Sequence, residues 1–292
     1  MINILLGVLG VITAGFAAVF GKDIYENKDN LGDNSFATVT GIGAVTNFFD
    51  ALGIGSFAPT TALLRGFKQI DDRVLPGTLN VSCTIPVVLE AFIFITVIEV
   101  EIVTLVSMLA AATIGAYLGA GVVAKMDEKK IQMVMGVALL VTAFLMVSGQ
   151  MGWMPVGGEA IGLTGIKLVI GVVGNFILGA LMTAGIGLYA PAMALVYVLG
   201  MSSRVAFPIM MGSCAFLMPV ASIKFVKEAA YDRKASLGIT IGGVVGVIIA
   251  TQIVKSLPLN ILTWLVVGVV TYTGSTMLKA AFENDSSQKK AA

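Results

Sequence analysis

The sequence contains no histidine, only two cysteines and few charged residues: Asp, Glu, Lys and Arg make up 12% of its 292 residues. Without histidine the chain lacks the commonest metal ligand and the side chain that most readily exchanges protons near neutral pH. Cys83 and Cys214 lie in apolar runs, so no framework of disulfides is expected. A soluble domain would carry roughly 25% charged residues. These absences exclude a soluble globular domain and a histidine-based metal centre.

Apolar sequence dominates instead. Hydrophobic residues make up 57% of the chain, and the mean hydropathy is +0.96. Many apolar runs approach or exceed the roughly 18–20 residues that span a bilayer as a helix. The sequence therefore predicts an all-α polytopic membrane protein. Its first apolar segment, residues 2–20, lacks a basic start and is interpreted as a retained helix rather than a cleaved signal peptide.

One motif occurs twice. GIGSFAPTTALL, from Gly53 to Leu64, recurs as GIGLYAPAMALV, from Gly185 to Val196. Each copy places a glycine-rich break before a proline, a residue favoured in the first turn of a helix. A helix that begins inside the membrane presents free N–H groups and the positive end of its dipole, which attract an anion. Two such helix ends, one in each half, predict an anion site at the middle of a transporter. The alternative is that the glycines only permit tight helix packing.

The halves also match outside this motif. GAVTNF (43–48) resembles GVVGNF (171–176) at an offset of 128. The offset becomes 132 at the breaks, which predicts an insertion of about one helical turn. At an offset of 131, Ser82 and Cys83 match Ser213 and Cys214, and the small residues Ala111, Gly115 and Gly119 match Gly242, Gly246 and Ala250. Small residues at this spacing let membrane helices approach closely. The chain is therefore interpreted as a duplicated bundle.

The predicted organisation has five parts. They are an N-terminal helix and loop (1–34), a first repeat (35–149), a connecting loop (150–162), a second repeat (163–281) and a disordered polar tail (282–292). Each repeat is predicted to hold a Gly-broken segment, at 36–67 and 163–199, followed by three transmembrane helices. These helices are expected near 78–98, 102–124 and 131–149 in the first repeat, and near 205–225, 236–254 and 259–280 in the second.

The positions of Lys and Arg favour one topology. If each broken segment crossed the membrane once, the 18 basic residues would divide 10 against 8. If each segment instead enters and leaves on the same side as a hairpin, only Lys167, Arg204 and Lys255 remain on one side and 15 lie on the other. The positive-inside rule favours the hairpins. The chain is then expected to lie in the plasma membrane with its C-terminus in the cytoplasm. A topology with a hairpin in the second half alone divides the basic residues 13 against 5, and this alternative remains open. With both hairpins, the two repeats are inverted, an architecture of secondary transporters.

These motifs resemble the sulfite exporter TauE/SafE family, also described as 4-toluene sulfonate uptake permeases. The resemblance rests on the GIGSFAP and GIGLYAP breaks, on the turns RVLP (73–76) and RVAFP (204–208), and on the Ser-rich helices that follow, and it covers residues 36–280. The chain departs from the family's GIGGG pattern, adds an N-terminal helix and carries Asp50 before the first break. The resemblance implies a duplicated helical transporter for sulfur-containing anions such as sulfite, sulfonates or sulfoacetate.

The predicted anion site is built from the two breaks and the polar residues near them. Gly53, Gly55, Gly185 and Gly187 would free the N–H groups at the helix starts of Ser56 and Leu188. Hydroxyl and amide side chains could donate further hydrogen bonds, although each is more often a helix–helix contact or a bond to its own helix. These candidates are Asn47, Ser56, Thr60, Thr61, Asn80, Ser82, Asn175 and Ser213.

Asp50 and Glu90 are the acids deepest in apolar sequence. A carboxyl inside the membrane is costly and by default suggests a function. Both are predicted to couple transport to protons, because a carboxylate ion beside an anion would repel it. The alternatives are a structural hydrogen bond and, for Glu90, a helix end at the interface.

The remaining candidates are the two arginines of the matched turns and the two cysteines. Arg204 is predicted to attract anions to the less basic side, whereas Arg73 is interpreted as a positive-inside anchor. Cys83 and Cys214 occupy matched positions and could react with sulfur compounds, although buried cysteines are more often small apolar fillers.

The leading hypothesis is a secondary transporter that works by alternating access around the paired helix ends, with proton coupling or the anion gradient as its driving force. No ATP-binding motif, dinucleotide fingerprint or catalytic group of residues is present, so neither an enzyme nor a cofactor nor a nucleic-acid partner is expected. A channel-like anion permease, a transporter of another organic anion, and a cation transporter using Asp50 and Glu90 remain open, as does a homo-oligomer.

Overall fold

The structure is a computed structural model that describes residues 2–94, 99–154, 157–253 and 259–291. Within these residues it is almost entirely helical, with one isolated bridge between Ala160 and Met201. The elements are α1 (Ile2–Glu26), α2 (Phe36–Ala51), α3 (Phe57–Gly66), the 3-10 turn η1 (Asp72–Val74), α4 (Leu75–Phe94), α5 (Ile102–Val123), α6 (Glu128–Gln150), α7 (Gly165–Met182), α8 (Tyr189–Val198), α9 (Ser203–Lys227), α10 (Arg233–Ile253) and α11 (Leu259–Ala291).

The predicted helices are present, and the main differences lie at their ends. The first helix continues past Phe20 to Glu26 and shortens the predicted loop. Helix α11 continues to Ala291, through the tail whose composition predicts disorder. The end of the predicted helix 78–98 and Lys255 lie outside the described residues.

Eight helices among the described residues are long and apolar enough to cross a membrane: α1, α4, α5, α6, α7, α9, α10 and α11. Helices α3 and α8 have 10 residues each. At 1.5 Å per residue each is about 15 Å long, half of a ~30 Å hydrocarbon core. These two helices are therefore too short to cross such a core, and α2 and α7 reach them through the glycine breaks.

Each broken segment is a hairpin whose two ends lie together. At the first, the backbone N–H of Ser35 donates to Oε1 of Gln69 at 3.0 Å, which joins the start of α2 to the residues after α3. At the second, Nζ of Lys167 donates to the carbonyl of Leu199 at 3.2 Å, which joins the start of α7 to the end of α8. Neither segment crosses the bundle from one end to the other.

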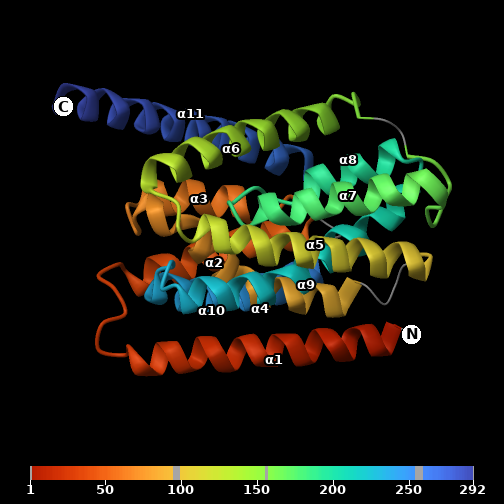
Figure 1. The fold of residues 1–292 in the computed structure, drawn as a ribbon, viewed down its shortest axis with the longest axis horizontal. Helices are drawn as coiled ribbons and strands as arrows, with labels where there is room; N and C mark the ends of the chain where they lie inside the picture. Colours follow the sequence, from red (N-terminus) through yellow and green to blue (C-terminus); the bar gives the residue numbers. More distant parts are fainter. Residues whose placement is uncertain (1, 95–98, 155–156, 254–258, 292) are drawn as a thin grey trace.

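The two hairpins open at opposite ends of α9, whose 25 residues make it about 38 Å long. Before the first hairpin, Nδ2 of Asn34 donates to Oδ1 of Asp232, just beyond the C-terminal end of α9, at 2.8 Å. Before the second, the carbonyl of Ala160 accepts from the N–H of Ser202, at the N-terminal end of α9, at 2.8 Å. Figure 1 accordingly places α3 toward one end of the long axis and α8 toward the other.

The helices of the two halves are interleaved. Helix α2 packs along α10 and helix α7 along α5, so the broken segment of each half lies against a helix of the other half. Helices α4 and α9 pack against each other, as do α6 and α11. A Cβ on Gly246 would overlap the carbonyl oxygen of Ala44, and a Cβ on Gly115 would overlap that of Phe176. The predicted small-residue ladders are therefore close-packing surfaces between the halves.

These contacts correct the predicted alignment of α2 with α7. Gly43 packs against Ile239, and Asn175 donates to the carbonyl of Met108. Met108 and Ile239 are equivalent positions of α5 and α10, at an offset of 131. The residues that contact them, Gly43 and Asn175, are therefore equivalent positions of α2 and α7, at an offset of 132. The same offset holds at the breaks, so no inserted turn separates the two helices. The predicted pairing of Asn47 with Asn175, at an offset of 128, is therefore wrong by one helical turn.

Helix α1 has no counterpart in the second half. It lies along α9 and α4 at the edge of the bundle (Figure 1) and buries Leu9, Phe16 and Phe20. Its last turn is attached by Asp23, whose Oδ2 accepts from Nε of Arg233 at 2.7 Å. Helix α1 therefore covers the outside of the bundle, against α9 and α4.

Candidate functional site

The two glycine breaks have the same backbone geometry. The N–H of Gly53 donates to the carbonyl of Asp50 at 2.8 Å, and the N–H of Gly185 donates to that of Met182 at 2.9 Å. The φ angles of Gly53 and Gly185 are +81° and +92°, which side chains disfavour. Gly55 also has a positive φ, of +95°, whereas its counterpart Gly187 does not. The motif therefore ends α2 and α7 in the same way and turns the chain back into α3 and α8.

The N-terminal ends of α3 and α8 line one cavity, called here the central cavity. Its volume is ≈ 30 Å³, enough for one or two water molecules. The first turn of a helix leaves N–H groups without partners inside the helix, so both helix ends direct donors toward this space. The lining residues are Asp50, Ile54, Gly55, Ser56, Phe57, Ala58, Val87, Thr142, Met182, Gly187, Leu188, Tyr189, Ala190 and Cys214. The breaks of both halves thus meet at one place.

Asp50 holds the first helix end. Its side chain is 3% exposed, and its Oδ2 accepts from Oγ of Ser56 at 3.0 Å. Ser56 is the residue that precedes α3, and its backbone N–H also interacts with the Asp50 carboxyl. The carboxyl therefore lies at the end of α3 where an anion is expected.

Glu90, on α4, is the second buried carboxyl. Its Oε2 accepts from the hydroxyl of Tyr189 at 3.2 Å, whereas Oε1 has no hydrogen-bond partner among the described residues. Glu90 also interacts electrostatically with Asp50. Two carboxyls, one from α2 and one from α4, therefore lie close to the two helix ends. The sequence analysis does not predict Tyr189 as a site residue. The second copy of the motif has this tyrosine where the first copy has Phe57, and that difference in polarity is the signal that could have identified it.

Both cysteines are buried beside this group, and their hydrogen-bond partners differ. Sγ of Cys214 donates to Sδ of Met182 at 3.6 Å and lines the central cavity. Sγ of Cys83 lies 3.7 Å from Oγ of Ser82. Among the described residues, no hydrogen bond joins the two thiols to each other.

Several predicted polar residues do not line the central cavity. Nδ2 of Asn47 donates to Gly43 in its own helix, and Nδ2 of Asn175 donates to Oγ of Ser213 at 2.8 Å. Ser82 likewise bonds within its own helix. Thr60 donates to Thr46 at 2.8 Å and joins α3 to α2. All of these residues are buried, and the bonds of Thr60 and Asn175 connect neighbouring helices.

The two arginines of the matched turns are exposed at the ends of helices, outside the central cavity. Arg204 lies in the first turn of α9, at the end where the second hairpin opens. Arg73 lies in η1. The structure therefore places Arg204 where it could act at an entrance, not where it could bind a ligand between the helix ends.

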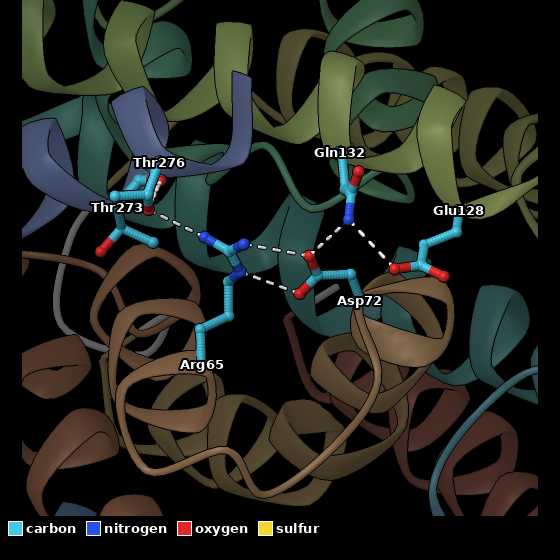
Figure 2. Close-up of polar contacts among 6 residues, drawn as sticks. All are labelled: Arg65, Asp72, Glu128, Gln132, Thr273 and Thr276. Carbon is cyan, nitrogen blue, oxygen red and sulfur yellow. Dashed lines mark hydrogen bonds and ion pairs between the residues drawn. The ribbon is translucent and has the colours of Figure 1, made fainter. Parts of the chain in front are cut away.

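A larger cavity, called here the vestibule, opens beside the first hairpin, with a volume of ≈ 990 Å³. Arg65, at the end of α3, donates from Nε and Nη2 to both carboxylate oxygens of Asp72 at 2.8 and 3.1 Å. Gln132 donates to the same carboxylate, and Nη1 of Arg65 donates to Thr276. Figure 2 shows how this network joins α3 and η1 to α6 and α11, with Gln132 also bonded to Glu128. The vestibule end of α3 is therefore fixed by charged hydrogen bonds.

A family model described as Sulfite exporter TauE/SafE matches residues 1–146, half of the chain. The matched part includes α1, the first hairpin, Asp50 and Glu90, so the prediction that the N-terminal helix is an addition to the family pattern is wrong. No curated protein and no solved structure matches the chain.

Proposed function

Because the chain belongs to the sulfite exporter TauE/SafE family and is a multi-pass membrane protein, we propose that it is a secondary transporter of small sulfur-containing anions such as sulfite, sulfonates or sulfoacetate. The anion would bind between the N-terminal ends of α3 and α8. The observation that carries this proposal is the central cavity, which residues from both glycine breaks line together.

The chemistry of the cavity supports an oxyanion ligand. A helix N-terminus carries a partial positive charge and free N–H donors, and two of them face this space. Pro59 and Pro191 have no N–H of their own and lie in the first turns of α3 and α8, so the preceding residues provide the donors. Ser56 adds a hydroxyl, and none of the described residues that line the cavity is Lys or Arg. An anion would therefore be bound by hydrogen bonds and helix dipoles rather than by an ion pair.

The size of the cavity and the direction of the hairpins support alternating access. A volume of ≈ 30 Å³ is too small for a sulfonate, so binding requires the helix ends to separate. The hairpins open at opposite ends of α9, as expected for inverted repeats that expose one site to each side in turn. The vestibule beside the first hairpin would be the approach from one side.

The same arrangement supports a cytoplasmic position for the vestibule and the C-terminus of a plasma-membrane protein. Arg65 ends α3 at this side of the bundle, and Lys224 and Lys227 lie in the last turn of α9. At the other side lie Lys167 and Arg204. This asymmetry follows the positive-inside rule.

Asp50 and Glu90 would couple transport to protons. Both carboxyls are buried at the helix ends. An ionised carboxyl there would repel the transported anion unless it first bound a proton. The same two carboxyls favour one other function, transport of a cation or an amine, in which they would bind the cargo directly.

Uptake into proteoliposomes driven by a pH gradient tests the proposal. Sulfite, thiosulfate, sulfoacetate and taurine are compared with sodium and amine controls. Saturable uptake of at least one sulfur anion supports the proposal. Uptake of cations alone would replace it by the cation hypothesis, and anion flux without saturation would indicate a channel-like permease.

A further inference from the structure

We propose that the Asp50 carboxylate is a built-in anion that competes with the transported anion for the N-terminal end of α3, so that each anion binds together with one proton taken up by Asp50. This inference rests on the proposed function and concerns the same site. It assigns Asp50 a specific role: the residue occupies the position of the ligand when it is ionised and gives up that position when it is protonated.

The geometry at α3 carries the first step. Oδ2 of Asp50 accepts the hydroxyl hydrogen of Ser56 at 3.0 Å, and the backbone N–H of Ser56 interacts with the same carboxyl. These are the donors that a transported oxyanion would need at this helix end. Asp50 lines the central cavity, so its carboxyl occupies this position at the end of α3 when no transported anion is bound.

The second half carries no such group. Met182 occupies the position of Asp50, and Leu188 occupies that of Ser56, as the matched bonds at Gly53 and Gly185 require. Leu188 makes no side-chain cap of α8. The end of α8 therefore has no carboxyl of its own, whereas at the end of α3 the hydroxyl and the backbone N–H of Ser56 already interact with Asp50. An anion that bridges both ends must displace the carboxylate.

The groups that face Asp50 cannot neutralise a second negative charge. The titratable groups that interact electrostatically with Asp50 are Cys83 and Glu90 of α4, Tyr189 of α8 and Cys214 of α9, all of which are acidic or neutral. Oε1 of Glu90 is fully buried and has no partner among the described residues, so this region has spare acceptors but no cation. A proton on Asp50 is then the means by which an anion is accommodated. It removes the repulsion and leaves the Ser56 hydroxyl free to donate to the anion.

The test is the pH dependence of anion binding to the purified full chain in nanodiscs. The probes are thiosulfate and methanesulfonate, whose charge does not change between about pH 6 and about pH 8.5, unlike that of sulfite. Where Asp50 is ionised in the free protein, the affinity of the wild type should fall about tenfold for each pH unit, because one proton binds with each anion. Asp50→Asn should bind at high pH at least as tightly as the wild type at low pH, without this dependence. Asp50→Glu should keep it.

The matched control is Asp29→Asn, which changes an exposed acid in the loop before α2 and should keep the wild-type profile. If Asp50→Asn does not fold, Ser56→Ala replaces it. Loss of the hydroxyl donor should move the midpoint of the pH profile upward, because the ionised Asp50 loses a partner.

A flat wild-type profile, an Asp50→Asn protein that keeps the slope, or a Ser56→Ala midpoint that does not move would each overturn the inference while the transport proposal stands. A folded Asp50→Asn protein that binds neither probe, next to a wild type that does, would also overturn it, since the carboxyl would then be a ligand for the substrate. Failure of every variant and of the wild type to bind any sulfur anion would remove the proposed function, and the inference with it.

Discussion

Asp50 and Met182 occupy equivalent positions at the two glycine breaks: each offers its carbonyl to the N–H of the glycine three residues later, Gly53 at 2.8 Å and Gly185 at 2.9 Å. The backbone of the two breaks is therefore duplicated, whereas the side chains are not. The acid is present in one half only. The two helix ends that line the central cavity are therefore similar in backbone, and only one of them has a carboxyl beside it.

Gly187 allows a direct test of the central cavity. It has an ordinary φ, and a Cβ built on it would meet nothing within 4 Å. We expect Gly187→Val to fold with a stability close to that of the wild type and to abolish transport, because its side chain would fill the space between the helix ends. Thermal unfolding and anion uptake measure the two effects.

The control for this variant is Gly41→Val, because Gly41 is exposed on α2 and also has free space. It should transport normally. Gly55 is a poorer choice: with φ at +95°, any side chain there is expected to cost about 1–3 kcal/mol of backbone strain and to confuse stability with blocking. A Gly187→Val protein with full activity would show that the anion does not pass between the ends of α3 and α8.

The close contact between α2 and α10 should not tolerate a side chain at Gly246. A Cβ there would overlap the carbonyl oxygen of Ala44, so Gly246→Ala forces the two helices apart. Overpacking of this kind costs typically about 1–3 kcal/mol. We expect a lower unfolding temperature and a poorer yield of folded protein, whereas Gly7→Ala on α1, with nothing within 4 Å, should change neither. Equal stability of the two variants would contradict the interleaved packing.

The pair Arg65–Asp72 should contribute measurably to stability. It is bidentate, its side chains are 19% and 11% exposed, and it fixes α3 beside α6 and α11 (Figure 2). A double-mutant cycle with Arg65→Ala and Asp72→Ala should give a coupling energy of about 1–3 kcal/mol. The pair Lys22–Glu26, at 74% and 59% exposed, is the control and should give almost no coupling. Similar coupling energies for both pairs would show that the network does not hold α3 in place.

Cysteine labelling tests the hairpins and the orientation together. The two native cysteines are buried, so new single cysteines can be labelled with little background. Lys28→Cys and Asp71→Cys flank the first hairpin and should react from the same side, the cytoplasm. Ile161→Cys, which precedes the second hairpin and is 50% exposed at the other end, should react only from outside. Labelling of residues 28 and 71 from opposite sides would mean that the first broken segment crosses the membrane.

The sequence predicts the breaks because their signal is local. A repeated Gly-x-Gly followed by proline has one simple structural explanation, and Gly53 and Gly185 adopt the positive φ that it needs. The prediction of the hairpins rests on a property of the whole sequence, the distribution of Lys and Arg along it. Both kinds of signal depend on residue type alone, so they do not require knowledge of the packing.

The polar residues around the breaks could not be assigned in the same way. Matching GAVTNF with GVVGNF placed Asn47 opposite Asn175, but in a helix lined with small residues a shift of four positions returns to the same face. Only the contacts of Gly43 and Asn175 with the partner helices fix the register. Tyr189 was missed because its role depends on Glu90, 99 residues away in the sequence.

The most direct test of the whole account is counterflow in proteoliposomes that are loaded with an unlabelled sulfur anion and diluted into a trace of the same anion carrying a label. We expect a transient accumulation of label above its equilibrium level in the wild type, because one alternating site exchanges anions across the membrane, and no accumulation in Gly187→Val. Label that only equilibrates in the wild type, or that accumulates equally in Gly187→Val, would contradict an alternating site between the ends of α3 and α8.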